Sequence, residues 1–138
     1  MARSDGRRHV SIFNSRPDFI EALRNALEQH EFAASSAHLA DIQSGALDLL
    51  GFVQKHQPEL VVYDLPRPYE THWNILRLLK DMRCLRDVVW VLTTTDKRAL
   101  EAAVGASGVV EIIFGEPYGV DDVVTAVAKR LPVAAGGR

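Results

Sequence analysis

The sequence predicts an α/β protein, in which helices cover both faces of a doubly wound parallel sheet. Short apolar runs with the length of strands alternate along the chain with segments whose apolar residues recur at helical spacing. The strongest runs, residues 60–63 and 88–92, consist of consecutive apolar or aromatic residues with no polar residue between them. Such strands are typical of parallel sheets that are buried by helices on both faces.

Five expected strands alternate with five expected helices along the chain. The strands are residues 9–13, 32–38, 60–63, 88–92 and 109–114. The helices are residues 17–30, 42–56, 73–82, 97–104 and 120–131. Gly45 and Gly51 weaken the second of these helices, because glycine inside a helix costs about 1 kcal/mol relative to alanine.

The length and composition of the chain fit a single domain. Of the 138 residues, 47% are hydrophobic and 25% are charged, which is typical of a globular protein. We expect the domain to span residues 9–131, with a flexible N-terminus at 1–8 and a flexible tail at 132–138. No apolar run is long enough to span a bilayer, and the N-terminus lacks the pattern of a signal peptide, so a cytoplasmic protein is expected.

Charge and cysteine content argue against several kinds of partner and cofactor. The net charge is −2, from 16 basic and 18 acidic side chains, which gives no electrostatic reason to expect nucleic-acid binding. Cys84 is the single cysteine, so an internal disulfide and a thiolate metal cluster are excluded. The histidines share no spacing typical of metal ligands, and surface positions are expected for them. They are His9, His30, His38, His56 and His72.

Polar residues stand at the carboxyl ends of four expected strands. Asn14, Asp64, Thr93 and Glu116 each follow such a strand within two residues. Doubly wound parallel sheets bind their ligands at these ends, near the point where the strand order reverses. The simpler interpretations are that Asp64 closes a turn, that Asn14 caps a helix and that Thr93 ends a β-favouring run. The four residues are therefore candidates for one site at this edge of the sheet.

The spacing around Asp64 resembles the receiver domain of two-component response regulators, which has a flavodoxin-like (βα)5 fold. Asp64 stands where the family has its phosphoacceptor aspartate, and Pro68 follows four residues later, as in the family. Thr93 and Thr94 stand where the family has a threonine or serine after the fourth strand. The resemblance covers roughly residues 10–131, which is almost the whole chain.

The sequence departs from the family pattern at the charged positions. Asn14 and Ser15 stand where the family has an acidic pair after the first strand. Glu116, followed by Pro117, stands where the family has a lysine followed by a proline. In the family, the acidic pair and the phosphoacceptor hold Mg²⁺, while the lysine and the hydroxyl bind the phosphoryl group. The resemblance therefore implies a receiver whose supporting charges have been replaced.

These replacements are expected to weaken both metal binding and phosphoryl binding. Mg²⁺ prefers carboxylate ligands, and only Asp64 and Asn14 would remain to hold it. Glu116 adds a negative charge, and a pair of unit charges about 4 Å apart interacts by on the order of 4 kcal/mol at an effective dielectric of about 20. Glu116 should therefore disfavour an aspartyl phosphate and raise the pKa of Asp64. Alternatively, Asp64 and Glu116 together hold a divalent metal.

The resemblance implies an atypical receiver domain in phosphorelay signal transduction, which acts through protein–protein contacts and is not an enzyme. Its partner would be a sensor kinase, a phosphotransfer protein, a downstream effector or a second copy of the chain, and not a nucleic acid or a membrane. The output surface of the family corresponds here to residues 97–104, 112–114 and 120–131.

Two alternative functions stay open at this point. A phosphorylation-independent dimerisation or scaffold module would use the same fold without chemistry at Asp64. A small-ligand-binding flavodoxin-like protein or enzyme is disfavoured, because the sequence has neither a G-x-G-x-x-G motif nor a phosphate-binding loop after the first strand. Pro66 also stands where a phosphatase of the haloacid dehalogenase type needs a second aspartate.

Overall fold

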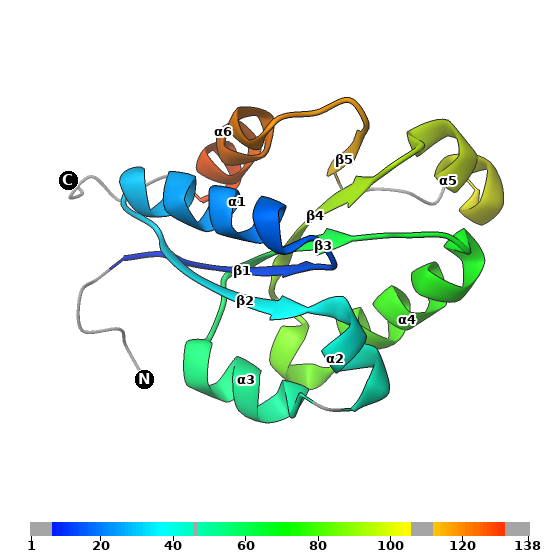
Figure 1. Ribbon diagram of the computed structural model, residues 1–138. Coiled ribbons are helices and arrows are strands. Elements are labelled where there is room, and N and C mark those ends of the chain that lie inside the picture. Colours follow the sequence, from blue (N-terminus) through cyan, green and yellow to red (C-terminus); the bar gives the residue numbers. More distant parts are fainter. Residues whose placement is uncertain (1–6, 46, 106–111, 132–138) are drawn as a thin grey trace.

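The protein folds around a five-stranded parallel sheet with the strand order β2-β1-β3-β4-β5 (Figure 1). The computed structural model describes residues 7–45, 47–105 and 112–131. The strands are β1 (His9–Asn14), β2 (Ala33–His38), β3 (Leu60–Asp64), β4 (Val89–Thr94) and β5 (Ile112–Gly115). The structure confirms the predicted α/β fold with its doubly wound parallel sheet.

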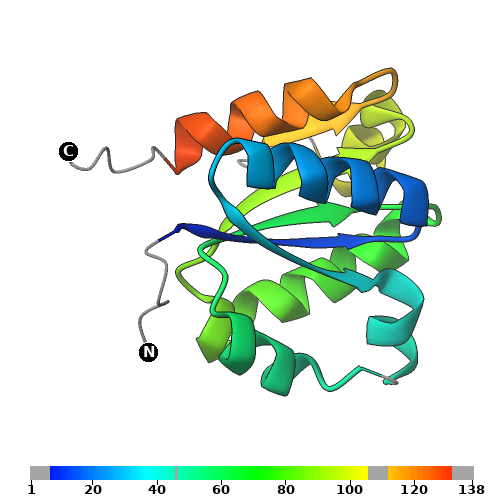
Figure 2. The same cartoon turned by 60° about the vertical axis from the view of Figure 1, so that its left-hand side comes forward.

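Helices cover both faces of this sheet. On one face, α1 (Pro17–Gln29) and α6 (Val120–Arg130) lie side by side (Figure 2). The other helices pack on the opposite face. They are α2 (Leu39–Ser44), α3 (Leu49–His56), α4 (Tyr69–Asp81), the 3-10 helix η1 (Arg83–Leu85) and α5 (Lys97–Val104). None of the helices in the described residues combines the length and the apolar character needed to cross a membrane.

Alternate residues of the central strands contribute to two apolar clusters, one on each face of the sheet. In β3, Leu60 and Val62 pack in the cluster formed with α1 and α6. Val61 and Tyr63 pack in the cluster on the opposite face, and all four residues are fully buried. Because helices cover both faces, β3 is apolar at consecutive positions, and its first polar side chain is that of Asp64 at its carboxyl end.

The prediction of one helix over residues 42–56 is wrong, because the chain forms two helices, α2 and α3, in this region. Gly45 ends α2 with a φ of 81°, in the left-handed region that glycine adopts without strain. Asp48 then begins α3 as its N-cap, and its side chain accepts a hydrogen bond of 3.1 Å from the backbone N–H of Gly51. The first glycine thus ends one helix, and the second donates the capping bond of the next.

Other element boundaries differ from the predicted ones by a few residues. α4 begins at Tyr69 instead of residue 73, and β4 continues through Thr94 instead of ending at residue 92. Of the strand predicted at 109–114, residues 112–114 are described and belong to β5, whereas 109–111 lie outside the described residues. Residues 1–6 and 132–138, which include most of the expected flexible ends, also lie outside them.

His9 is buried, which corrects the expectation that all the histidines lie at the surface. It is 7% exposed, and its Nε2 lies 2.9 Å from the Oγ atom of Ser35. That Oγ atom lies 2.7 Å from the Oγ atom of Ser11, so the three side chains form a buried polar link between β1 and β2. Among the described residues, no group of three or more His, Cys, Asp or Glu side chains is placed to hold a metal ion.

Gly115 is required where the end of β5 approaches the start of α5. A Cβ atom added to Gly115 would lie 2.7 Å from the Cβ atom and 2.9 Å from the backbone nitrogen of Lys97. We expect Gly115→Ala to lower the free energy of unfolding by about 1–3 kcal/mol, measured by urea denaturation, because the backbone must shift. Gly119→Ala is the control, since the nearest atom to its Cβ would be 3.8 Å away. Equal losses in the two variants would contradict the steric argument.

Tyr63 is fully buried, and among the described residues its hydroxyl has no hydrogen-bond partner. Burial, followed by the charge of Asp64, raises the pKa of Tyr63 to about 12, so the hydroxyl stays protonated. A buried hydroxyl without a partner costs about 1–3 kcal/mol. We therefore expect Tyr63→Phe to raise the midpoint of urea unfolding.

The matched control for this prediction is Tyr69→Phe. The hydroxyl of Tyr69 lies 3.1 Å from the Oγ1 atom of Thr95 and accepts a hydrogen bond of 3.3 Å from the Nε–H group of Arg67. Removing that hydroxyl should lower the free energy of unfolding by about 0.5–1.5 kcal/mol, the net value of a typical hydrogen bond. A Tyr63→Phe protein that is destabilised as much as Tyr69→Phe would show that the Tyr63 hydroxyl has a partner.

Candidate functional site

The carboxyl ends of the strands gather the candidate site residues at one edge of the sheet. Asp64 ends β3, and the parallel register pairs it with Thr93 of β4. Asn14 ends β1, the other neighbour of β3 in the sheet. Glu116 follows the last residue of β5, and its backbone N–H donates a hydrogen bond to the carbonyl oxygen of Thr94. This edge includes the point between β1 and β3 where the strand order reverses, as expected for a binding site.

The carboxylate of Asp64 is held in place by β4. The Oγ1 hydroxyl of Thr93 donates a hydrogen bond of 2.8 Å to the Oδ1 atom of Asp64. The hydroxyl of Thr94 instead donates a 2.8 Å bond to the carbonyl oxygen of Leu65, on the residue that follows Asp64. The two predicted threonines therefore differ in position, because Thr93 contacts the carboxylate and Thr94 fixes the backbone next to it.

Asn14 and Ser15, which stand at the acidic-pair positions expected from the resemblance, lie at the end of β1 and in the turn that follows it. Asn14 is only 2% exposed, and its Oδ1 atom accepts a hydrogen bond of 2.9 Å from the backbone N–H of Arg16. This local bond turns the chain from β1 into α1, so the amide oxygen of Asn14 is engaged within its own turn. Ser15 is exposed to solvent.

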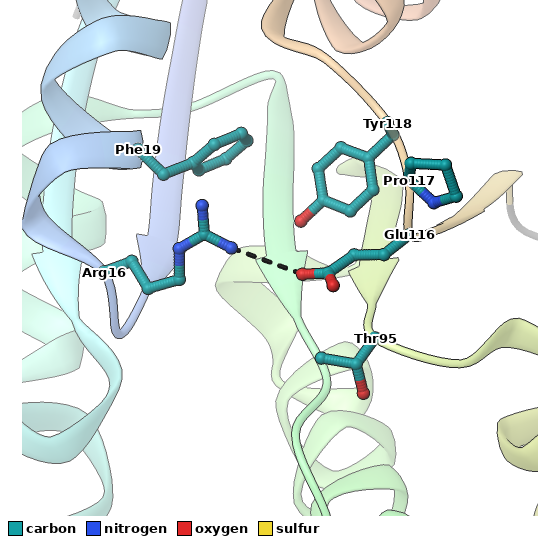
Figure 3. Close-up of a pocket in the computed structure, with 6 residues that line it drawn as sticks. All are labelled: Arg16, Phe19, Thr95, Glu116, Pro117 and Tyr118. Carbon is teal, nitrogen blue, oxygen red and sulfur yellow. Dashed lines mark hydrogen bonds and ion pairs between the residues drawn. The ribbon is translucent and has the colours of Figure 1, made fainter.

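Arg16 is a site residue that the sequence reasoning missed. Its Nη1 atom lies 3.3 Å from the Oε2 atom of Glu116, and the two side chains are 53% and 42% exposed (Figure 3). Its guanidinium also lies over the ring of Phe19, 5.6 Å from the ring centroid. The sequence contains a signal for this pair. A cation stands just after β1 and an anion just after β5, whereas the family has anions after the first strand and a cation after the fifth.

A pocket of about 660 Å³ opens beside this ion pair. Its lining residues are Arg16, Phe19, Thr95, Glu116, Pro117 and Tyr118. Figure 3 shows the Arg16 guanidinium between the Phe19 ring and the Glu116 carboxylate. The phenol oxygen of Tyr118 is directed toward them. The two aromatic rings are perpendicular, with their centroids 5.8 Å apart. The peptide bond between Glu116 and Pro117 is cis. The pocket therefore offers a cation, an anion and two aromatic walls.

The pKa of Asp64 is raised, as expected, but the expected cause is not the main one. Burial contributes most to this rise, and the negative charge of Glu116 adds a smaller part. The hydrogen bond from Thr93 lowers the pKa of Asp64, and so do the charges of Arg16 and His72. The guanidinium of Arg16 thus opposes the effect of Glu116 on the pKa of Asp64.

The arrangement of donors does not fit a divalent cation. The Oδ1 atom of Asp64 accepts the hydroxyl hydrogen of Thr93, and the Oδ1 atom of Asn14 accepts a backbone hydrogen. Glu116 is paired with the guanidinium of Arg16, a fixed positive charge that would repel a metal placed between the two carboxylates. The pair Asp64 and Asn14 therefore offers a single carboxylate, and the pair Asp64 and Glu116 has a guanidinium beside it, so neither pair matches the carboxylate set that Mg²⁺ prefers.

Comparisons with known proteins support the fold through structure alone. No protein-family model and no curated protein sequence matches the chain. A response regulator receiver protein from Burkholderia phymatum is similar in structure, with a TM-score of 0.67 and 19% identity, over 94% of this chain and 98% of that chain. A response regulator from Thermotoga maritima has a TM-score of 0.66 and 18% identity, over 89% and 96% of the two chains.

A third solved structure with a similar fold is described as a sensor protein and not as a response regulator. A sensor protein from Polaromonas sp. JS666 has a TM-score of 0.69 and 18% identity, over 89% of this chain and 94% of that chain. At such identities the comparisons establish the fold. The chain has the flavodoxin-like fold of receiver domains, as the sequence predicted, and the roles assigned to individual site residues stay predictions.

The raised pKa of Asp64 gives a prediction for the pH dependence of stability. The folded protein holds the proton of this carboxyl to a higher pH than the unfolded chain, whose value is about 3.8. The contribution of Asp64 to the free energy of unfolding therefore falls as the pH rises from that value through the folded pKa. We expect Asp64→Asn, which can still accept the Thr93 bond, to be more stable than the wild type near pH 7.

This advantage should disappear near pH 3, where the carboxyl is neutral in both states. Urea unfolding at the two pH values measures the effect. Asp87→Asn, which removes an exposed carboxylate from the turn before β4, is the matched control and should not show the same gain. If the Asp64→Asn protein were less stable than the wild type at neutral pH, the ionised carboxylate of Asp64 would not be destabilising and the prediction would be wrong.

Proposed function

We propose that the protein is an atypical receiver domain that works in two-component signal transduction through contacts with other proteins. The observation that carries the proposal is the hydrogen bond of 2.8 Å between the Thr93 hydroxyl and the Asp64 carboxylate at the end of the central strand β3. These are the two residues that the resemblance assigns to the phosphoacceptor and its neighbouring hydroxyl. The receiver-like fold of almost the whole chain supports the same function.

The charges around Asp64 argue against efficient phosphorylation by the usual Mg²⁺-dependent route. Catalysis of phosphoryl transfer consists mainly of positioning and of neutralising charge with metal ions and cations. Here Asn14 and Ser15 supply no carboxylate, and Glu116 supplies a negative charge where the family has a lysine. We therefore propose a binding module, not an enzyme, in which Asp64 marks the signalling site.

The proposed partners are proteins: a sensor kinase, a phosphotransfer protein, a downstream effector or a second copy of the chain. The surface expected to contact an effector consists of α5, β5 and α6, which in the family transmits the state of the site. β5 connects this surface to the site directly, because Glu116 and Pro117 follow its last residue. A change in the position of Glu116 would therefore act on the end of β5 and on the start of α6.

The test restores the family charges and asks whether Asp64 then behaves as a phosphoacceptor. We expect the triple variant Asn14→Asp, Ser15→Asp, Glu116→Lys to bind beryllofluoride in the presence of Mg²⁺ about tenfold or more tightly than the wild type, which corresponds to about 1.4 kcal/mol. Isothermal titration calorimetry measures this affinity. The physical reason is that the variant gains two metal ligands and exchanges an anion for a cation.

The same triple variant that also carries Asp64→Ala is the control, and it should bind no beryllofluoride. Circular dichroism of each variant establishes that it is folded. If the folded triple variant does not bind beryllofluoride, or binds it equally well without Asp64, the end of β3 is not a phosphoacceptor site and the proposed function is wrong.

A further inference from the structure

Arg16 places a positive charge at the edge of the sheet that carries Asp64. The hydrogen bond from its backbone N–H to Asn14 fixes the turn from which the side chain extends, and Phe19 supports the guanidinium from one side. Figure 3 shows this guanidinium among the side chains that line the pocket, directed toward Glu116. The charge acts on the candidate acceptor, because Arg16 opposes the rise in the pKa of Asp64.

The guanidinium is available to a ligand. Its polar contact with the described residues is a single one, at 3.3 Å to Glu116, and both partners are about half exposed. Exposed ion pairs of this kind contribute little to stability, because water screens them and side-chain entropy opposes them. An arginine carries five N–H donors in a planar fork, so most of the donors of Arg16 are left for an anion that enters the pocket.

Hydroxyl groups complete the set of donors near Asp64. The Thr93 hydroxyl already contacts the Oδ1 atom of Asp64, which leaves the Oδ2 atom as the other reactive oxygen. The Tyr118 hydroxyl points into the pocket that Arg16 and Glu116 line, at the same edge of the sheet, whereas the Thr95 hydroxyl is engaged with the hydroxyl of Tyr69. A phosphoryl group on Asp64 needs positive charge and N–H or O–H donors around its oxygens, and a guanidinium supplies both without a metal.

We propose that Asp64 accepts a phosphoryl group without a divalent metal, with the guanidinium of Arg16, which lines the pocket at the same edge of the sheet, as the cation that binds its oxygens. The inference rests on the proposed function, in that Asp64 is the acceptor. The donor is a small acyl phosphate. The Oδ2 atom of Asp64 forms the new bond to phosphorus, the bond between phosphorus and the acyl oxygen breaks, and the carboxylate of the donor leaves with the bonding electrons.

Glu116 has the opposite effect in this site from the effect it would have in a metal site. It competes with the phosphoryl group for the guanidinium of Arg16, so its removal should favour phosphorylation. If Asp64 and Glu116 instead held a divalent metal together, removing Glu116 would weaken the site. The sign of the effect of Glu116→Gln therefore separates the two possibilities.

The experiment treats the full chain with acetyl phosphate in the presence of EDTA and follows phosphate incorporation by intact-mass spectrometry. The wild type should be labelled, Asp64→Asn should not, and Arg16→Gln should lose about tenfold or more, as expected for a lost charge-assisted bond. Arg16→Lys should recover part of the labelling, because it keeps the charge without the planar fork. Glu116→Gln should be labelled up to about fivefold faster than the wild type.

Several results would overturn the proposal. They are labelling that requires Mg²⁺, labelling that is unchanged in Arg16→Gln, slower labelling of Glu116→Gln, and no labelling of either the wild type or Glu116→Gln in EDTA. The charge-restored triple variant in Mg²⁺ separates this failure from that of the proposed function. If only that variant is labelled, the role of Arg16 is wrong and Asp64 remains a phosphoacceptor position, whereas if no variant is labelled, both proposals are wrong.

Discussion

Helices cover both faces of β3 and its neighbouring strands, and this two-sided burial restricts charged side chains to the ends of the strands. Every residue of β3 from Leu60 to Tyr63 is fully buried in one of the two apolar clusters. A carboxylate within this run would lose its hydration without a partner, which is costly. Asp64 is tolerated at the carboxyl end, where it accepts a hydrogen bond from Thr93. The position of the site thus follows from the packing of the core.

The electrostatics of this edge depend on a partly buried carboxylate that has a guanidinium nearby. Burial raises the pKa of Asp64, whereas Thr93 and Arg16 act against that rise. The exposed pair between Arg16 and Glu116 connects the turn after β1 to the turn after β5. A ligand that draws the guanidinium toward Asp64 would release Glu116, which is joined to the start of α6 through only a few residues. Such a coupling would connect the state of the site to the surface proposed for partner contact.

Much of the fold could be predicted from local patterns, and the errors occur where local patterns are ambiguous. The runs that form β3 and β4 are apolar at consecutive positions, which is a local pattern that predicts a buried strand. The helix predicted over residues 42–56 joined two helices, because apolar spacing alone does not reveal that Gly45 adopts a left-handed conformation. His9 was assigned to the surface, although Ser35 of β2 satisfies its ring in the interior. That contact depends on the register between β1 and β2, and the hydrophobic periodicity of the sequence does not specify this register.

The sequence by itself determined the strands, most of the helices and the residues at the strand ends, because hydrophobic periodicity and chain-local spacing encode them. It thereby placed Asp64, Thr93 and Glu116 at one edge of the sheet. Only the tertiary structure decided that Arg16, 100 positions away in the sequence from Glu116, pairs with it beside Asp64. The partner of a long, exposed and flexible side chain depends on where distant turns lie in space, and no local pattern specifies that. The charge balance of the site is therefore a property of the folded protein.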